Sequence, residues 1–454
     1  MEKKRFAGIE VPPDLNRKNF VFLYLSTFLI GILLTIPGII QPVFLKEIIN
    51  IPDEFFGSVN GTLQSMAQVA SLLFIGIIGI LSDKTGRKPP VVAGFILLAV
   101  FYLLFLYSNS IADLLHIPAD FSAAICAALS FSSAKETFVP FSPGLLTAYA
   151  IRFFIGFCLV LVFPQFKTMV ADYTYEKDRG KGMAFYGVMI GLGSLVVFTA
   201  LAPIGKKTGV EMLFYIASGI AVAGTVLSLL GLRERLPEQK SGQGRVKELL
   251  RIVNKSFPLK ASYLCAFITR VDVAITPTFL IAWAVMLAPK YGLSSEAASF
   301  KGTVPMMVMG AFTLFAYPVF GILLDRWGRM PTIILTLFLG GAGFLCVASS
   351  PTPFPNIFTI LGVLLIGCCV SGAVVGSSTL AADASPPELV GSTLGGLNTV
   401  AQVGMILFLF SGGVIFDKLG PGWVFITKGI INIALGIYLF IVRNKIAVHS
   451  ESAH

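Results

Sequence analysis

The sequence predicts an all-α integral membrane protein with 12 transmembrane helices arranged in two six-helix halves. Three observations predict it: an apolar composition, the spacing of the apolar runs, and a segment that occurs twice. Of the 454 residues, 55% are hydrophobic and 13% are charged, whereas a soluble domain has about 25% charged residues. At about 20 apolar residues per spanning helix, this chain contains enough for about a dozen spans. Such a composition makes most soluble classes of protein improbable.

The chain lacks the common motifs of catalysis and cofactor binding. Its six cysteines are scattered and mostly lie inside apolar runs, which indicates apolar packing rather than a disulfide framework or a metal site. The sequence contains no phosphate-binding loop, nucleophile elbow or zinc-binding HExxH motif. We therefore expect no enzyme activity, no cofactor and no metal. The net charge of +10 would suggest a nucleic-acid partner in a soluble chain, but in a membrane chain basic residues set orientation, so none is expected.

Apolar runs long enough to cross a bilayer fall into two groups of six. They lie at about 20–45, 56–82, 89–108, 144–171, 180–202 and 210–232, and then at 259–288, 303–324, 331–349, 355–382, 391–416 and 422–442. The predicted organisation is an N-terminal segment (1–19), a first half (20–232), a linker (233–258), a second half (259–442) and a tail (443–454). A charged segment without a small-residue cleavage site precedes the first run, which predicts a retained span rather than a signal peptide.

Basic residues predict the orientation of these spans. With the N-terminus inside, inner segments carry 23 Lys and Arg residues and outer loops carry 7. Because inner loops are enriched in Lys and Arg, we expect both termini in the cytoplasm, across a plasma or bacterial inner membrane. The basic linker contains RVKELLRIVNK, which predicts an amphipathic helix on the inner leaflet. A plain linker is the alternative.

Two segments repeat, GILSDKTGRKP from Gly79 and GILLDRWGRMP from Gly321, so that Asp83 and Asp325 are 242 residues apart. Asp172 and Asp383, at the ends of the fourth and tenth spans, are only 211 residues apart. The first half therefore contains an insertion, for which the polar segment 109–142 on the outer face is the candidate. It is predicted to fold against the outer mouth, either as a neutral decoration or with a role in substrate access. Cys126, inside it, is expected to react with an impermeant thiol reagent if it is exposed.

The repeated segments carry a family resemblance. Gly79, Asp83, Lys84, Gly86 and Arg87 resemble the G-x-x-x-D-[KR]-x-G-R loop signature of the major facilitator superfamily, and the copy from Gly321 falls where that family repeats it. RFFIGF from Arg152 resembles the R-x-x-x-G motif of the fourth span. ADYTYEKDRGKG, which includes Arg179, is similar to the connection between spans four and five.

The resemblance implies gating roles at the cytoplasmic helix ends. Residues that would latch the cytoplasmic side closed are Asp83, Arg87, Asp172 and Arg179 in the first half and Asp325, Arg329 and Asp383 in the second. The glycines of the two signatures are expected to allow close helix approach and tight turns. They are Gly79, Gly86, Gly321 and Gly328. The alternative is that the charges only fix topology.

One departure from the family concerns drug exporters. Their fifth span carries G-x-x-x-G-P-x-x-G-G, whereas this chain has GVMIGLGSLV from Gly187, with Leu192 in place of the proline. In the second half, Asn398 and Gln402 stand where Gly187 and Gly191 stand in the first. The departure weakens the case for export.

Charged residues inside spans are candidates for function because they are costly in hydrocarbon. Arg270 and Asp272 are predicted near the bilayer midplane, Arg152 in its outer half, and Pro277 is expected to break the seventh span. Asp272 is expected to face Arg152 or water. Lys167 and Lys428 are expected to reach a membrane surface.

Polar side chains recur at helical spacing in two spans and, together with Gln41, are predicted to line a polar cavity. Packing by hydrogen bonds between helices is the alternative. The set is Gln41, Asn60, Gln64, Gln68, Asn398 and Gln402.

The leading hypothesis is a monomeric secondary transporter of a small organic solute in the lipid bilayer, with protonation of Asp272 as the coupling event. Two arginines near one aspartate favour an anionic substrate, whereas RERLPEQK after the sixth span is typical of exporters. Export is slightly favoured. Uptake of an organic anion is an alternative, and so is a sensor or lipid-handling protein that has lost transport.

Overall fold

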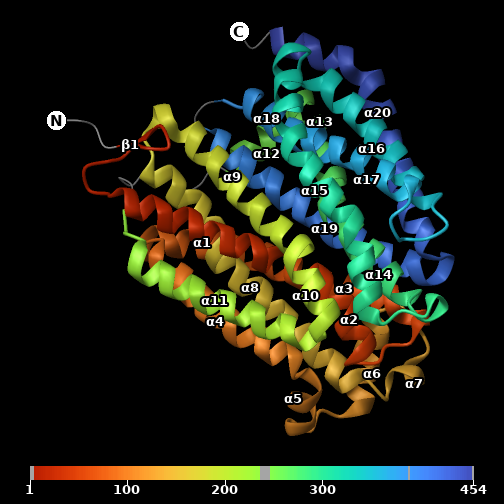
Figure 1. The fold of residues 1–454 in the computed structure, drawn as a ribbon. Helices are drawn as coiled ribbons and strands as arrows, with labels where there is room; N and C mark the ends of the chain where they lie inside the picture. Colours follow the sequence, from red (N-terminus) through yellow and green to blue (C-terminus); the bar gives the residue numbers. More distant parts are fainter. Residues whose placement is uncertain (1–4, 236–245, 387–388, 452–454) are drawn as a thin grey trace. The chain divides into compact units, whose positions relative to one another are not determined.

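The computed structural model describes residues 5–235, 246–386 and 389–451, most of which are helical (Figure 1). Twelve helical stretches within these ranges are long and apolar enough to cross a membrane. Each corresponds to one predicted run, so the predicted all-α fold with 12 spans is confirmed. Residues 236–245 of the predicted linker and 452–454 of the predicted tail lie outside the described residues.

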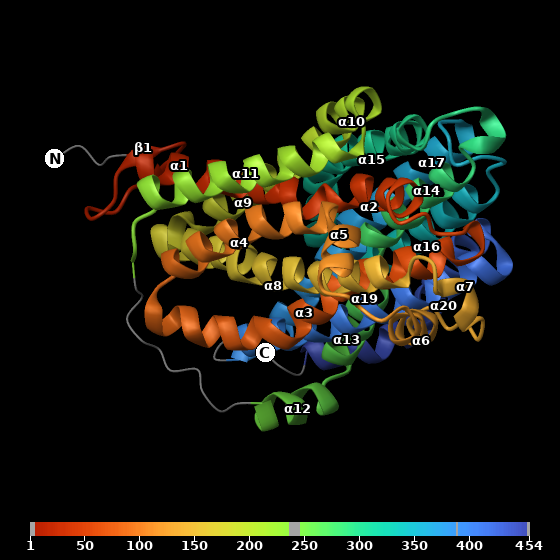
Figure 2. The same ribbon diagram turned by 90° about the horizontal axis from the view of Figure 1, so that it is seen from below.

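The chain forms two compact units, which we describe one at a time. The first unit comprises Met1–Pro52, Thr62–Gln239 and Gly292–Phe300. Its elements are β1 (Arg5–Phe6), β2 (Ile9–Glu10), α1 (Arg17–Thr35), α2 (Pro37–Glu47), most of α3 (Phe56–Thr85), α4 (Lys88–Leu106), α5 (Ser108–Leu114), α6 (Ala119–Leu129), α7 (Lys135–Phe138), α8 (Ser142–Tyr173), α9 (Arg179–Val196), a π-helix (Val197–Leu201), α10 (Ala202–Thr208) and α11 (Val210–Gly231). Within it, α1 lies beside both α9 and α11 (Figure 2).

The second unit comprises Asp53–Gly61, Lys240–Tyr291 and Lys301–His454. Its elements are α12 (Val246–Lys255), α13 (Phe257–Thr269), α14 (Asp272–Met286), most of α15 (Ser295–Arg326), α16 (Arg329–Ala348), α17 (Ile357–Cys369), a π-helix (Val370–Val374), α18 (Val375–Asp383), α19 (Val390–Leu419) and α20 (Pro421–Glu451). Here α16 packs against α17 and α20 (Figure 1). Ile252 and Val253 of α12, in the predicted amphipathic segment, pack on α13 and α19 residues.

The seventh span is interrupted at its charged residues and not at its proline. We expected Pro277 to break the helix, but it lies inside α14, and the interruption falls at Arg270 and Val271. The N–H groups of Ala274 and Ile275 both donate to the carbonyl of Val271 at 2.8 Å, so the first turn of α14 forms ahead of the proline. A proline inside a helix removes its own N–H bond and crowds the carbonyl four residues earlier, and α14 continues through Pro277 despite both effects.

Small residues let the helices of each unit approach closely. A Cβ on Gly156 of α8 would lie 2.5 Å from the Cα of Ala67 in α3, and one on Gly343 of α16 would lie 2.6 Å from the carbonyl oxygen of Gly362 in α17. In lipid, close van der Waals packing of this kind replaces the hydrophobic effect as the force that holds helices together.

The insertion folds as three short helices, α5, α6 and α7, of which α5 and α6 pack on α8. Ser122 of α6 shares a hydrogen bond of 2.8 Å with Ser142, the first residue of α8. Cys126 is fully buried, and burial raises the pKa of its thiol to about 12. A buried thiol with so little thiolate reacts slowly, so Cys126 does not meet the condition of exposure on which its labelling was expected.

Candidate functional site

The second unit contains a buried ion pair in the middle of the Phe257–Met286 span. Asp272, the first residue of α14, places Oδ1 2.6 Å from Nζ of Lys428 in α20, and the two residues are 0% and 1% exposed. Asn432, one helical turn after Lys428, donates from Nδ2 to Oδ2 of Asp272 at 2.9 Å. The thiol of Cys369 donates to the same oxygen at 3.5 Å. Both oxygens of Asp272 therefore have a partner inside the unit, Oδ1 through an ion pair and Oδ2 through hydrogen bonds.

Lys428 completes this network on its other side. Its ammonium donates to Oδ1 of Asn432 and lies over the rings of Phe344 and Phe408, at 5.4 and 5.5 Å from their centroids. These aromatic faces stabilise a cation in a site that is closed to water. The network has four polar groups from α14, α17 and α20, and the carboxylate and the ammonium cancel each other's charge.

Two expectations about this region are wrong. Asp272 faces Lys428 of its own unit rather than Arg152 or water, and Lys428 is buried rather than reaching a membrane surface. Lys428 lies about two turns into α20, too deep for its side chain to leave the helix bundle. A signal was present in the sequence, because Lys428 and Asn432 are four residues apart and so share one face of an apolar helix.

Arg152 of α8 is a charged residue buried inside a span of the first unit, and it is 2% exposed. Its Nη2 donates to Oε1 of Gln64 in α3 at 3.0 Å. Its Nε and Nη1 have no hydrogen-bond partner in the part of the chain that the structure describes. A buried guanidinium with open N–H groups is costly unless a ligand completes it. Gln64 and Arg152 both belong to the predicted set of site residues, and the structure brings them into contact.

Arg270 differs from Asp272 although only Val271 separates them. It lies at the interruption between α13 and α14 and is exposed, whereas Asp272 is fully buried. Tyr317 of α15, 43% exposed, lies within electrostatic range of it. Among the described residues, no carboxylate forms an ion pair with Arg270.

The remaining polar residues of the predicted site separate into buried and accessible ones. Asn60 is buried in the second unit and donates to the carbonyl of Thr278 at 2.9 Å, which is the packing alternative. Gln41 is buried in the first unit. Gln68 and Gln402 are half-buried, and Asn398 is exposed.

The first copy of the loop signature forms a dense polar cluster. Nη1 of Arg87 lies 2.5 Å from Oδ1 of Asp83 and donates to Ser82 at 2.6 Å, and Nε lies 3.6 Å from Asp172. The carboxylate of Glu234 accepts from the backbone N–H groups of Arg87 at 2.8 Å and Lys88 at 2.9 Å. It thereby caps α4, whose N-terminal dipole favours a negative charge.

Arg235 extends this cluster. It donates to the carbonyl of Asp172 at 2.7 Å and forms an ion pair with Asp14 at 3.3 Å. The sequence singled out RERLPEQK, but not Glu234 or Arg235 as partners of the loop signature. Arg179, predicted to be part of the latch, begins α9, is exposed, and has no ion pair with another described residue.

The second copy of the signature is simpler. Arg329 pairs with Asp325 at 2.5 Å and with Asp383 at 2.9 Å, and its side chain is 29% exposed, against 7% for Arg87. Both predicted triads therefore meet in space. In the described part of this copy, no residue occupies the place of Glu234.

The glycines of the signature divide into two kinds. Gly86 and Gly328 both have φ of +95°, a conformation that favours glycine, as the predicted tight turns require. A Cβ on Gly79 or Gly321, by contrast, would meet nothing within 4 Å among the described residues. The expected close helix approach at these two positions is therefore wrong.

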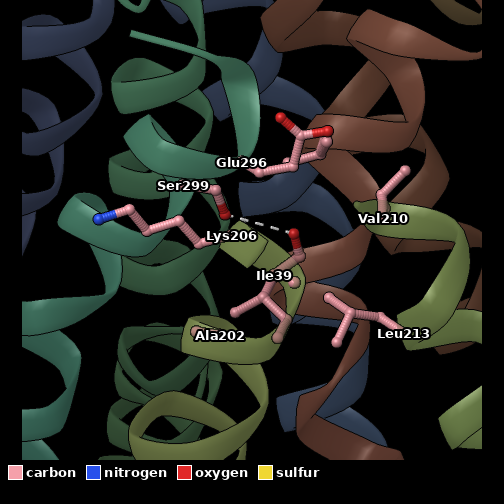
Figure 3. Close-up of a pocket in the computed structure, with 9 residues that line it drawn as sticks. Ile39, Ala202, Lys206, Val210, Leu213, Glu296 and Ser299 are labelled. Carbon is pink, nitrogen blue, oxygen red and sulfur yellow. Dashed lines mark hydrogen bonds between the residues drawn. The ribbon is translucent and has the colours of Figure 1, made fainter. Parts of the chain in front are cut away.

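A pocket in the first unit contains none of the predicted site residues (Figure 3). Apolar side chains of α2, α10 and α11 line it, together with Glu296 and Ser299 from the start of α15. Ser299 donates to the carbonyl of Ile39 at 3.4 Å. The amine of Lys206 points away from the pocket and lies 5.3 Å from the ring centroid of Phe300.

Comparison with known families gives a match along nearly the whole chain. The family model described as Major Facilitator Superfamily matches residues 23–269 and 262–453. The two matches follow the duplication in the sequence and together span both units.

Individual relatives are distant. The chain is 25% identical to the magnetosome protein MamH of Paramagnetospirillum magneticum over 421 residues, 92% of this chain and 90% of MamH. It is 24% identical to Multidrug resistance protein 2 of Bacillus subtilis over 437 residues, 89% of this chain and 90% of that protein.

A solved structure of the nucleoside transporter NupG has the same fold, with a TM-score of 0.72 at 14% identity, over 93% of this chain and 99% of NupG. Sequence match, duplicated loop signature and 12 spans agree. The protein belongs to the Major Facilitator Superfamily and is a multi-pass membrane transporter of small molecules rather than an enzyme.

Proposed function

We propose that this protein is a proton-coupled secondary transporter of a small anionic organic solute. The observation that carries the proposal is the contrast between a neutralised aspartate and two arginines without acidic partners inside the spans. Asp272 is matched by Lys428 at 2.6 Å. Arg152 and Arg270 have no carboxylate within ion-pair distance among the described residues. An anionic substrate supplies the charge that they lack.

The coupling step is protonation of Asp272. A proton on this carboxylate removes the countercharge of Lys428, which keeps the Asn432 amide oxygen and two aromatic rings as partners. A buried cation without its counterion is destabilised by several kcal/mol. The protonated protein therefore favours a conformation in which Lys428 gains water or another anion. Proton binding is linked in this way to the conformation of the second unit.

Substrate recognition is assigned to one of the two arginines, Arg152 in the first unit or Arg270 in the second. Arginine binds carboxylate and phosphate groups with several directed N–H bonds. Arg152 offers two buried N–H groups without partners, and Arg270 is exposed beside Tyr317. The exposed Asn398 and half-buried Gln402 are polar groups of the second unit that can contribute.

The loop clusters are assigned to gating. Asp83 and Asp325 each hold the arginine of their own copy at 2.5 Å, at helix ends far from the middle of the spans. Asp83→Asn is expected to lower transport turnover and to leave substrate affinity within a few-fold. The charge distribution supports cytoplasmic termini in a plasma or bacterial inner membrane, and we propose a monomer.

Export of an amphiphilic solute is a second candidate. Similarity to Multidrug resistance protein 2 along 89% of the chain favours it. The two candidates differ in direction and in substrate charge, so one reconstituted assay separates them.

The test is transport by the purified full chain in lipid vesicles with an imposed pH gradient. A panel of radiolabelled carboxylates and phosphate esters is first screened by the thermal shift that each causes at pH 6 and pH 8. For a compound that binds, we expect a pH gradient to drive its accumulation, and Asp272→Asn to abolish this accumulation while exchange across the membrane continues.

Asp120→Asn is the matched control, because Asp120 is exposed on α6 outside the spans. It is expected to transport like the original chain. Well-folded Asp272→Asn protein that still concentrates the compound with a proton gradient overturns the coupling role. Binding confined to neutral or cationic amphiphiles, moved out of the cytoplasmic side, supports the exporter instead.

A further inference from the structure

The insertion of the first unit presents large apolar side chains on its surface. Four large apolar side chains on it are strongly exposed, Leu114 at 77%, Leu115 at 64%, Phe121 at 59% and Phe131 at 61%. The opposite face of α6 packs on α8 through small residues, and Ala123 and Cys126 there are fully buried. Four exposed residues of this size within 18 positions indicate a surface that is normally covered.

Tyrosines mark the level at which this face begins. Tyr107, between α4 and α5, and Tyr215 of α11 share a hydrogen bond of 2.6 Å between their hydroxyls and are 46% and 44% exposed. Tyrosine collects at the boundary between hydrocarbon and water. The span of α4 ends at Leu106, so α5 starts at this boundary. Figure 1 shows α5, α6 and α7 at the end of the unit opposite to the β1 hairpin.

The exposed face continues the lipid-facing side of α4. Ile96 and Val100 of α4 are both 47% exposed, Tyr107 is 46% exposed, and Leu114 of α5 is 77% exposed. At about 100° per residue, Ile96 and Val100 lie about 40° apart on α4, which ends at Leu106, before α5 begins at Ser108. Exposed apolar side chains therefore continue along the chain from the membrane span onto the insertion.

The charges of this region point to hydrocarbon rather than to a charged partner. Between Pro89 and Ala134 the sequence has no lysine or arginine, and its acidic residues there are Asp113 and Asp120. Binding through this face depends on apolar area, as for helices that lie in the plane of a membrane interface.

We propose that residues 111–131 lie in the membrane interface at the non-cytoplasmic side, with Leu114, Leu115, Phe121 and Phe131 among the lipid acyl chains. The insertion is then a lipid-binding segment of the first unit, attached to α4 and α8. The proposal is independent of substrate and coupling. The side of the membrane follows from the orientation proposed above.

The experiment uses the full chain in phosphatidylcholine vesicles, with tryptophan introduced by Leu114→Trp or Phe121→Trp. Ser133→Trp is the matched control, since Ser133 is exposed in the loop between α6 and α7. The signal of the original chain, with its three tryptophans, is subtracted. We expect lipids brominated on their acyl chains to quench the new tryptophan at 114 and 121 at least about twofold more than at 133, and aqueous iodide to quench 133 most.

Two results overturn the proposal. Equal quenching by iodide at all three positions places the face in water. Protection of positions 114 and 121 from both iodide and brominated lipid places it against protein, such as a second copy. Elution of each variant as a single species from a sizing column, together with unchanged thermal unfolding, excludes misfolding as the cause of either result.

Discussion

The two units treat their buried charge in opposite ways. In the second unit, both carboxylate oxygens of Asp272 have a partner among the described residues, and the Asp272–Lys428 pair has no net charge. In the first unit, Arg152 is as deeply buried but has one hydrogen bond, to Gln64, and two N–H groups without partners in the described chain. Removing one partner of the first arrangement leaves a buried charge without its countercharge, whereas the second has an energetic cost that a bound water or an anionic ligand would remove.

In the proposed function, this difference separates two tasks, proton coupling and substrate binding. A neutral pair is sensitive to a proton, because protonation of one partner leaves the other charged. An incomplete cation is sensitive to an anion. The duplicated halves therefore have the same helix plan but different chemistry at their centres, and variants of each centre are expected to fail in different ways.

The largest effect is expected from Lys428→Ala. It leaves the Asp272 carboxylate buried without its countercharge, which costs about 3–5 kcal/mol when a buried pair is broken. Thermal unfolding in detergent is expected to show a strong loss of stability. The double variant Asp272→Asn with Lys428→Met should regain most of that stability and still lack proton-driven transport. If the double variant is as unstable as the single variant, Asp272 and Lys428 do not act as a charge pair.

Arg152→Ala is expected to have a smaller effect on stability and a specific effect on binding. It removes two nitrogen donors that have no partner, so the unfolding temperature should change little. Affinity for an anionic ligand should fall about tenfold or more, since a charge-assisted hydrogen bond contributes about 1.5–3 kcal/mol. Isothermal titration with the ligand found in the screen measures this. Arg152→Lys keeps the charge and should lose less. If Arg152→Ala loses as much thermal stability as Lys428→Ala, the arginine only holds helices together.

The sequence predicted the structural features that depend on local patterns of residues. Hydropathy gave the 12 spans, and the repeated signature gave the pairs of Arg87 with Asp83 and of Arg329 with Asp325, because residues four apart share one helix face. The third member of each cluster, Asp172 or Asp383, was implied by the family resemblance and not by a local pattern. Lys428 was misplaced because its depth was judged from the start of an apolar run. Its partner Asp272 lies 156 residues earlier in the chain, and no local pattern reports such a contact. The same holds for Glu234, which caps α4 from beyond the sixth span.

The two loop copies allow a sharper comparison at their turn glycines. Gly86→Ala and Gly328→Ala both place alanine at φ of +95°, at a cost of about 1–2 kcal/mol. At Gly86 the new Cβ would also lie 2.5 Å from the carboxyl carbon of Glu234, whereas at Gly328 the nearest atom, of Pro331, is 3.8 Å away. Gly86→Ala is therefore expected to unfold at the lower temperature. Equal unfolding temperatures indicate that Glu234 moves aside at no cost.

The smallest effect concerns the β1–β2 hairpin of the first unit and its dependence on pH. Asp178 accepts from the Glu10 N–H at 2.9 Å and pairs with Lys181 at 3.0 Å. These bonds favour the charged form and hold the pKa of Asp178 below its ordinary value. The hairpin contact is therefore complete at neutral pH and is lost as the pH falls below about 3.9 and through the lower pKa of the folded state.

Amide hydrogen exchange at Ile9 and Glu10 measures this contact. Asp178→Asn keeps the shape of the side chain but not its charge, so at pH 7 it should exchange a few-fold faster than the original chain. Its exchange, corrected for the intrinsic pH dependence of the chemistry, should then stay constant between pH 7 and pH 3, while that of the original chain rises. Lys177 also pairs with Glu10, at 2.5 Å, so Lys177→Ala is the comparison that loosens the hairpin and retains the pH dependence of Asp178. If the original chain shows no rise on acidification, Asp178 does not hold the hairpin.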